Sequence, residues 1–196
     1  MRLLAVVGTL GALVAAPAQG EDWTGFYAGV LGGYADGEID AITVGMTRPV
    51  TGYSLGAAVG YRIERGPLVL AIEADASWSN MQYQDSSSTF SLQNLGTLRV
   101  QAGVPIGWTL PYVTAGLAIG TGRSQIPFVA SDLSRIHLGY AAGVGVEVAL
   151  GDTLSVKAEH LRVELGGQDY AAPAGAPTSV VGFGFGVTRI GVNARF

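Results

Sequence analysis

The sequence contains no cysteine and few charged residues. Of its 196 residues, 11 are Lys or Arg and 15 are Asp or Glu, a charged fraction of 13% against about 25% in soluble globular proteins. The absence of cysteine excludes a disulfide framework, a thiolate metal site and a cysteine nucleophile. With a net charge of -4 and no cluster of Lys or Arg, the chain also has no electrostatic footprint for a nucleic acid.

The sequence also lacks a long apolar run beyond its first residues. After residue 18 no apolar stretch reaches the roughly 18 residues of a membrane-spanning helix, which excludes a helical membrane protein. Before that point, Met1 and Arg2 precede the apolar residues 3–16, and Ala16-Pro17-Ala18 has the small residues of a cleavage site. We therefore expect a signal peptide over residues 1–18 and one exported domain over residues 19–196.

The remaining chain alternates between large apolar residues and small or polar ones. Residues 51–62 show this best, because large or apolar side chains occupy the odd positions and mainly Gly, Ala and Ser the even ones. Such alternation is typical of β-strands. Residues 23–35 form another segment, whose phase is ambiguous because Gly and aromatic residues occupy both faces. The other six segments cover residues 68–78, 97–104, 112–120, 137–148, 154–161 and 189–196.

The identity of the inward face distinguishes a soluble barrel from a membrane barrel. A soluble barrel would turn its large apolar side chains inward and show water mainly Gly, Ala and Ser. In a membrane barrel the apolar face contacts lipid and the small face lines a narrow lumen, which explains both the 30 Gly and the low charge. We therefore predict an all-β protein, an eight-stranded antiparallel up-and-down transmembrane β-barrel.

The connections between the segments alternate between long and short. The long ones are residues 36–50, 79–93, 121–134 and 166–181, and the short ones are residues 63–66, 105–109 and 149–153. Outer-membrane barrels have short periplasmic turns and longer extracellular loops. The pattern predicts a protein of the cell outer membrane with both termini in the periplasm, its loops outside, and contacts with lipid and lipopolysaccharide.

Aromatic residues lie at both ends of the expected spans. Such girdles anchor membrane barrels at the two interfaces. Toward the periplasmic end we expect Trp23, Tyr61, Trp108, Tyr112 and Phe196, and toward the outer end Tyr34, Tyr53, Trp78, Tyr140, Phe183 and Phe185.

Seven charged residues occupy positions that face the lumen. A buried ion loses its hydration and is unfavourable unless it is paired. An eight-stranded barrel is just wide enough for side chains to fill it, so we expect a charged plug, with a transient narrow channel as the alternative. The expected pairs, from similar depths on neighbouring strands, are Glu73 with Arg99, Glu147 with Lys157, and Glu159 with Arg189, with Asp75 at the edge.

Several stretches resemble the small outer-membrane β-barrel proteins of Alphaproteobacteria, often labelled porin-family or opacity-like proteins. They are DWTGFYAGVLGGY at residues 22–34, LPYVTAGLAIG at 110–120, VGVEVALGDTLSVKAEHLRVELG at 144–166 and the ending TRIGVNARF. His160 departs from the resemblance, because these proteins usually carry an aromatic residue there. Phe196, with Ile190 and Val192 at alternating positions before it, resembles the C-terminal signal that directs outer-membrane proteins, with periplasmic chaperones, to the barrel-assembly machinery.

Residues suited to catalysis or cofactor binding are few. Of the two histidines, His137 is expected near the outer rim and His160 on the lipid-facing side, and SRIH at residues 134–137 has no evident acidic partner. We therefore expect no enzyme, no metal site and no resident cofactor. Some members of the resembled family bind haemin, so haemin on His137, His160 or Tyr170 is a further hypothesis.

The expected function is structural: envelope integrity together with surface contact through four loops. The second and fourth loops, rich in Ser and Gln or in Pro and Ala, are suited to such contacts because loops are exposed and mobile. The alternatives are a narrow low-conductance porin, and an adhesin or haemin-binding protein whose loops contact a host surface.

Overall fold

The computed structural model describes residues 22–41, 46–85, 88–125, 133–170 and 179–196, and nearly all of them lie in strands. The predicted signal peptide, residues 1–18, lies outside these ranges. No helix among the described residues is long and apolar enough to span a membrane. The strands are β1 (Gly25–Ala41), β2 (Met46–Arg65), β3 (Leu68–Asp85), β4 (Ser88–Gly103), β5 (Thr109–Gln125), β6 (Leu133–Ala149), β7 (Leu154–Tyr170) and β8 (Ser179–Arg195).

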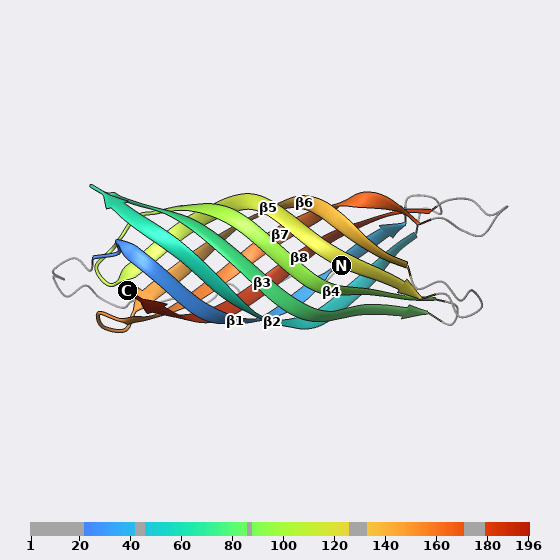
Figure 1. Ribbon diagram of the computed structural model, residues 1–196, viewed down its shortest axis with the longest axis horizontal. Coiled ribbons are helices and arrows are strands. Elements are labelled where there is room, and N and C mark those ends of the chain that lie inside the picture. Colours follow the sequence, from blue (N-terminus) through green and yellow to red (C-terminus); the bar gives the residue numbers. More distant parts are fainter. Residues whose placement is uncertain (1–21, 42–45, 86–87, 126–132, 171–178) are drawn as a thin grey trace, which may run out of the picture.

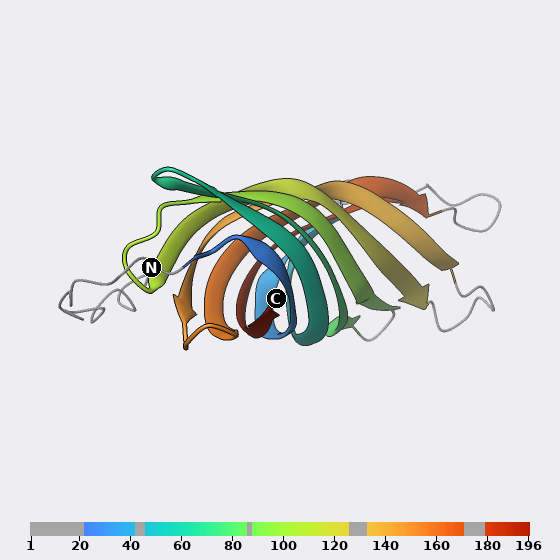
Figure 2. The same ribbon diagram turned by 60° about the vertical axis from the view of Figure 1, so that its left-hand side comes forward.

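The eight strands form one closed barrel, in which each strand pairs antiparallel with the next and β8 pairs with β1 (Figure 1). Stepping from Tyr27 to its cross-strand partner on β2, and so on from strand to strand, returns to β1 at Gly37 and not at Tyr27. Neighbouring strands are therefore staggered. The stagger requires the strands to tilt against the barrel axis, and the tilt is clear in Figure 1 and Figure 2. The predicted fold class is confirmed.

The strands are longer than the alternation of side chains predicts. β2 contains 20 residues and β4 contains 16, and β1 stays paired with β2 as far as Ala41 and Met46. The hydropathy pattern places the strand ends too early. Beyond the alternating segments the strands continue through backbone hydrogen bonds, which need no alternation of apolar side chains. Most of the predicted loop residues in 36–50, 79–93, 121–134 and 166–181 are therefore strand, and the described residues leave out only 42–45, 86–87, 126–132 and 171–178 between strands.

One end of the barrel carries short turns and the other carries the remaining connections; we call them the turn end and the loop end. The turns join β2 to β3, β4 to β5 and β6 to β7. Gly66, Gly107 and Gly151 lie in these turns with φ of 60°, 61° and 84°. Glycine adopts such angles without the steric penalty of a side chain, so all three turns can be tight.

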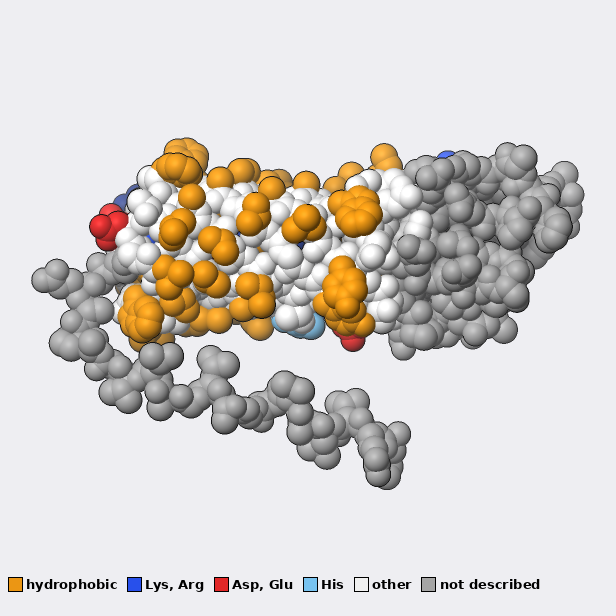
Figure 3. Space-filling model, turned by 90° about the horizontal axis from the view of Figure 1, so that it is seen from below, with side chains coloured by type: hydrophobic (Ala, Val, Ile, Leu, Met, Phe, Trp, Pro, Cys, Tyr) orange, Lys and Arg blue, Asp and Glu red, His pale blue; other side chains and the backbone are white. Residues whose placement is uncertain are grey.

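The outer wall of the barrel is apolar. Leu117 and Leu138 are 68% and 67% exposed, whereas Arg99 and Lys157 inside the barrel are each 1% exposed. Hydrophobic side chains spread over the wall from the turn end in Figure 3. This distribution is the reverse of that in a soluble protein, and it matches a barrel whose outer face contacts lipid.

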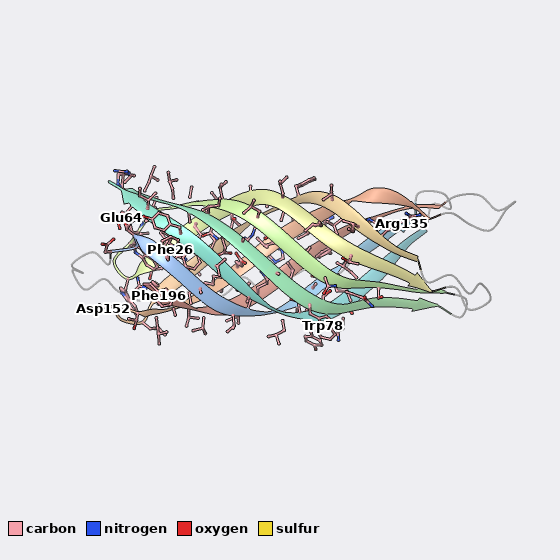
Figure 4. All side chains as sticks on the ribbon, in the orientation of Figure 1. Phe26, Glu64, Trp78, Arg135, Asp152 and Phe196 are labelled. Atoms are coloured by element: carbon pink, nitrogen blue, oxygen red, sulfur yellow. The ribbon has the colours of Figure 1, made fainter. Side chains whose placement is uncertain are left out.

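Two sets of exposed aromatic residues border this wall. The rings of Phe26 and Tyr61 pack 4.7 Å apart toward the turn end, and those of Tyr34 and Tyr53 pack 5.3 Å apart toward the loop end. Figure 4 shows Phe26 and Phe196 at the turn end beside Glu64 and Asp152, with Trp78 farther along the barrel and Arg135 near the loop end. The other exposed members are Trp108 toward the turn end and Trp78 and Tyr140 toward the loop end.

Candidate functional site

Arg99 on β4 is the centre of a buried cluster of ion pairs in the lumen. Its Nη2 lies 2.6 Å from Glu73 Oε1 and 2.9 Å from Asp75 Oδ2, and its Nη1 lies 3.1 Å from Glu159 Oε2. All four side chains are fully buried. One guanidinium does not balance three carboxylates, so the cluster needs further cations.

Arg189 and Lys157 supply these cations. Arg189 Nη1 lies 2.8 Å from Asp75 Oδ1 and its Nε lies 2.8 Å from Glu159 Oε1. Lys157 Nζ lies 2.7 Å from Glu73 Oε2. With equal numbers of cations and anions the cluster is neutral, which is the condition under which ions tolerate burial. We call Glu73, Asp75, Arg99, Lys157, Glu159 and Arg189 the central cluster.

Glu147 belongs to a separate ion pair nearer the turn end. Arg62 Nη2 lies 2.5 Å from Glu147 Oε2 and its Nη1 lies 3.0 Å from Oε1. Ser155 and Asn193 also donate hydrogen bonds to this carboxylate. The predicted pair of Glu147 with Lys157 is wrong: the two residues are cross-strand partners, but Lys157 reaches Glu73 while the guanidinium of Arg62 meets Glu147 from across the lumen.

Two lumen residues were misjudged from the sequence. Arg62 was missed, although it ends the alternating residues 51–62 on their small-residue face, a pattern that places it in the lumen. Asp75 was expected at the edge of the network, but both Arg99 and Arg189 contact it and Thr97 donates a hydrogen bond to it. Depth along neighbouring strands does not describe contacts across the lumen, such as that of Arg189 with Asp75.

Tyr112, predicted in the inner girdle, lies inside the barrel. It is 4% exposed, and its hydroxyl donates to Glu159 Oε2 at 3.1 Å. Its ring covers Gly145, the cross-strand partner on β6. A buried tyrosine hydroxyl needs a hydrogen-bond partner, and the carboxylate in the lumen provides it, so Tyr112 is part of the interior and not of the girdle.

The arrangement around Tyr112 occurs twice in the barrel. Tyr27 on β1 is also buried, its hydroxyl donates to Glu73 Oε2 at 2.7 Å, and its ring covers Gly60. The two halves of the barrel therefore contribute equivalent side chains to one central cluster. Corresponding cross-strand rows contain Tyr27, Gly60, Glu73 and Arg99 in β1–β4, and Tyr112, Gly145, Glu159 and Arg189 in β5–β8.

We expect the substitutions Gly60→Ala and Gly145→Ala to destabilise the barrel by about 1–3 kcal/mol each, as overpacking does in a tight interior. A Cβ at either position would overlap the tyrosine ring above it. Urea unfolding of the refolded protein in detergent, followed by tryptophan fluorescence, measures the effect. The control is Gly32→Ala on the exposed outer face, where a Cβ meets nothing within 4 Å; an equal loss in all three variants would contradict the tyrosine packing.

Trp23, also predicted in the inner girdle, is buried at the turn end of the lumen. The Cζ atoms of Arg62 and Arg195 lie 5.5 Å and 5.2 Å from its ring centroid. Cations over the ring face stabilise an indole, which explains why Trp23 lies inside and not in the lipid interface. Trp23, Val69, Leu110 and Ala149 form an apolar layer at the turn end.

Phe185, predicted in the outer girdle, lies in a second apolar layer on the loop side of the central cluster. It is 2% exposed, because odd positions of β8 such as Val187 and Arg189 face the lumen. The side chain of Phe183 lies outside the described residues. Within the described barrel the lumen thus holds an apolar layer, an ionic layer and a second apolar layer. The second one consists of Ala35, Met81, Leu92, Leu95, Ala118, Ala141, Leu161, Val163, Leu165, Phe185 and Val187.

The two histidines lie on opposite sides of the barrel wall. His137 is buried in the lumen with Nδ1 3.0 Å from Gly166 O, whereas His160 is exposed on the outer face with Nδ1 2.9 Å from Thr188 Oγ1. They do not converge on a common ligand. The side chain of Tyr170 lies outside the described part of the chain, within which no three His, Cys, Asp or Glu residues gather as metal ligands.

The last strand presents Ile190, Val192 and Phe196 on the outer face. These side chains are 62%, 44% and 82% exposed. The Phe196 backbone N–H donates to Phe26 O at 2.9 Å, so the C-terminus closes the barrel against β1. The three side chains remain accessible to another protein, and their role as an assembly signal stays a prediction.

Three comparisons place the chain among known proteins. It matches the family model for the outer membrane protein beta-barrel domain over residues 4–196. It is 29% identical over 150 residues to the 25 kDa outer-membrane immunogenic protein of Brucella abortus, covering 76% of this chain and 68% of that protein. It is 28% identical over 178 residues to the 22 kDa outer membrane protein of Rhizobium leguminosarum, covering 89% of this chain and 78% of that protein.

A solved structure shows the same fold. Neisserial surface protein A (NspA) is similar with a TM-score of 0.58 and 19% identity, covering 88% of this chain and 98% of that chain. The apolar outer wall and the charged interior agree with a location in the cell outer membrane, as the names of the Brucella and Rhizobium relatives also indicate. The chain belongs to the family of the outer membrane protein beta-barrel domain.

Proposed function

We propose that this outer-membrane barrel is a structural, non-enzymatic protein that supports envelope integrity and makes surface contacts at its loop end. One observation carries the proposal: side chains fill the described lumen, with a neutral ionic cluster between two apolar layers. A barrel of this width that is filled with side chains offers a solute no aqueous path. The protein then acts through its wall and its loop end.

The narrow-porin alternative requires this interior to open. An ion that crosses the barrel has to displace the layer around Trp23 and separate pairs such as Arg99 with Glu73, which lie 2.6 Å apart. Separating a buried pair leaves uncompensated charges, which is strongly unfavourable. The filled lumen therefore favours a barrel that does not conduct.

The loop end is suited to contacts at the cell surface. β1 and β2 stay paired beyond the exposed Tyr34 and Tyr53 as far as Ala41 and Met46, so the hairpin extends past the outer aromatic girdle. The Brucella abortus relative is named an immunogenic outer-membrane protein, which supports exposure of this end to the outside. We propose lipopolysaccharide or a host surface as its partner, after export through residues 1–18 and assembly of the barrel with periplasmic chaperones and the barrel-assembly machinery.

Deletion of the gene from its host tests the proposed function. We expect the deletion strain to lose resistance to detergent, and the full chain to restore it. A variant with shortened β3–β4 and β7–β8 hairpins should restore detergent resistance but lose surface contacts, measured as binding of intact cells to a host cell layer. Heat-modifiable migration on a gel verifies that this variant folds.

Two results would count against the structural role. One is a deletion strain whose detergent resistance equals that of the parent. The other is stepwise conductance of the purified wild-type barrel in a planar lipid bilayer, which would support the narrow-porin alternative. Because the first result concerns the envelope and the second the lumen, the two outcomes are distinguishable.

A further inference from the structure

The outer wall near the loop end is apolar on one strand and polar on the next two. On β6, Ile136, Leu138 and Tyr140 are 61%, 67% and 59% exposed. Among the described side chains, no large apolar residue is exposed on β7 beyond Leu154, nor on β8 on the loop side of Ile190. We call the residues that replace them the β7–β8 polar face: His160, Arg162 and Glu164 on β7, and Gly184, Gly186 and Thr188 on β8.

The β7–β8 polar face lies at a depth where its neighbour still presents apolar side chains. Glu164 is the cross-strand partner of Tyr140, and Leu138 and Ile136 lie on β6 still nearer the loop end. Charged side chains on the lipid face of a barrel are most unfavourable at the bilayer midplane and less so near the aromatic girdle to which Tyr140 belongs. Of the ionisable residues of this face, His160 lies farthest from that girdle along β7. Intramembrane ionisable residues mark functional sites by default, so this face calls for a partner other than acyl chains.

The glycines of β8 form a floor on which the β7 side chains rest. A Cβ at Gly184 would lie 2.8 Å from Glu164 Oε2 and 2.9 Å from Arg162 Nη2, and one at Gly186 would lie 3.2 Å from His160 Cε1. The long side chains therefore lie low against the wall. Gly184 and Gly186 are themselves buried under these side chains, so the side chains project little and a second wall can approach closely.

The one arginine of the face is already paired with a carboxylate. Arg162 Nε lies 2.7 Å from Glu164 Oε1, and the two side chains remain 57% and 35% exposed. Asp36 on β1 adds a further exposed carboxylate beside Gly186. The face therefore does not favour an anionic lipid headgroup. It is complementary to a surface whose carboxylate faces Arg162 and whose cation faces Glu164.

We propose that the β7–β8 polar face is an interface with a second copy of this chain. Under a two-fold axis along the membrane normal, the same patch of both copies meets itself. Arg162 of one copy then faces Glu164 of the other, and the reciprocal pair forms across the axis. The glycine floor lets the two walls approach, and the ionisable groups leave the lipid.

A single cysteine in a chain without cysteine tests this interface. We expect Thr188→Cys in the full chain, expressed in the outer membrane and treated with a short bifunctional maleimide, to give a covalent product of twice the 20.1 kDa of the chain, less the signal peptide if it is cleaved. The matched control is Leu117→Cys on the apolar wall of β5, which is 68% exposed and should stay monomeric. Heat-modifiable migration verifies that both variants fold.

Charge exchange tests the pairing. Added to Thr188→Cys, the single changes Arg162→Glu and Glu164→Arg are expected to reduce the dimer yield several-fold, because each places like charges across the axis. The double exchange should restore it. Three results would overturn the proposal: equal dimer yields from Thr188→Cys and Leu117→Cys, a cross-linked product with a different protein, or a monomer whose co-purifying lipopolysaccharide is lost on Arg162→Ala.

Discussion

The substitution Arg99→Met is expected to destabilise the barrel by about 3–5 kcal/mol, the range for removing one partner of a buried ion pair. Arg99 contacts three carboxylates, those of Glu73, Asp75 and Glu159, and all four side chains are fully buried. Without its guanidinium the central cluster has three anions against the two remaining cations, Lys157 and Arg189. The carboxylates then repel one another where little water reaches them.

Urea unfolding of the barrel refolded in lipid vesicles measures this loss, as a lower transition midpoint followed by tryptophan fluorescence. The control is Arg65→Met, which removes an exposed cation at the turn end of β2. Exposed charges contribute less than about 1 kcal/mol, so its midpoint should change little. Equal midpoints for the two variants would refute the idea that the cluster stabilises the barrel.

The pair of Arg62 with Glu147 is the second point at which single changes should have a large effect. We expect Arg62→Met and Glu147→Leu to cost about 3–5 kcal/mol each, because each leaves one buried charge without its partner. Replacing both residues removes the charge from the site and leaves only Ser155 and Asn193 without their acceptor. The double variant should therefore be more stable than the sum of the two single losses implies.

A double-mutant cycle with the same urea unfolding assay gives the coupling between Arg62 and Glu147. Residues in one hydrogen-bonded network couple by about 0.5–3 kcal/mol. We expect the coupling energy of Arg62 and Glu147 in the upper part of that range, because their fully buried side chains make two contacts, of 2.5 Å and 3.0 Å. Strictly additive losses would show that Arg62 and Glu147 act independently. A cycle with Lys157→Met in place of Arg62→Met should give the weaker coupling, since Lys157 contacts Glu73.

Much of the barrel is already visible in the sequence. The alternation in residues 51–62 separates the exposed Tyr53, Leu55 and Val59 from the side chains that face inward. Successive side chains of a strand point to opposite faces, so which face a residue occupies is a local property that the neighbouring residues reveal. For the same reason the seven charged residues predicted to face the lumen all do so.

For some aromatic residues the local pattern does not determine whether the side chain lies in the lumen or in the girdle. Tyr112 and Trp108 both lie near the start of β5 and have the same apolar character, yet Tyr112 is buried against Glu159 and Trp108 is 44% exposed. Trp108 lies in the turn before β5, whereas Tyr112 lies in the strand on the same inward face as the buried Thr114. Trp23 precedes β1, where the sequence phase is ambiguous, and only its contacts with Arg62 and Arg195 place it inside.

The sequence by itself determined the membrane barrel, the number of its strands and the seven charged residues predicted to face its lumen, because strand periodicity and composition are local properties. It also predicted the pairs of Glu73 with Arg99 and of Glu159 with Arg189 on neighbouring strands. The tertiary structure alone decided the pairs across the lumen. Arg62 and Glu147 lie 85 residues apart in the sequence. They meet only because the sheet closes into a barrel, with the stagger by which the cross-strand partners of Tyr27 lead back to Gly37. Closure brings distant strands to face each other across a narrow lumen, and no pattern along one strand contains that geometry.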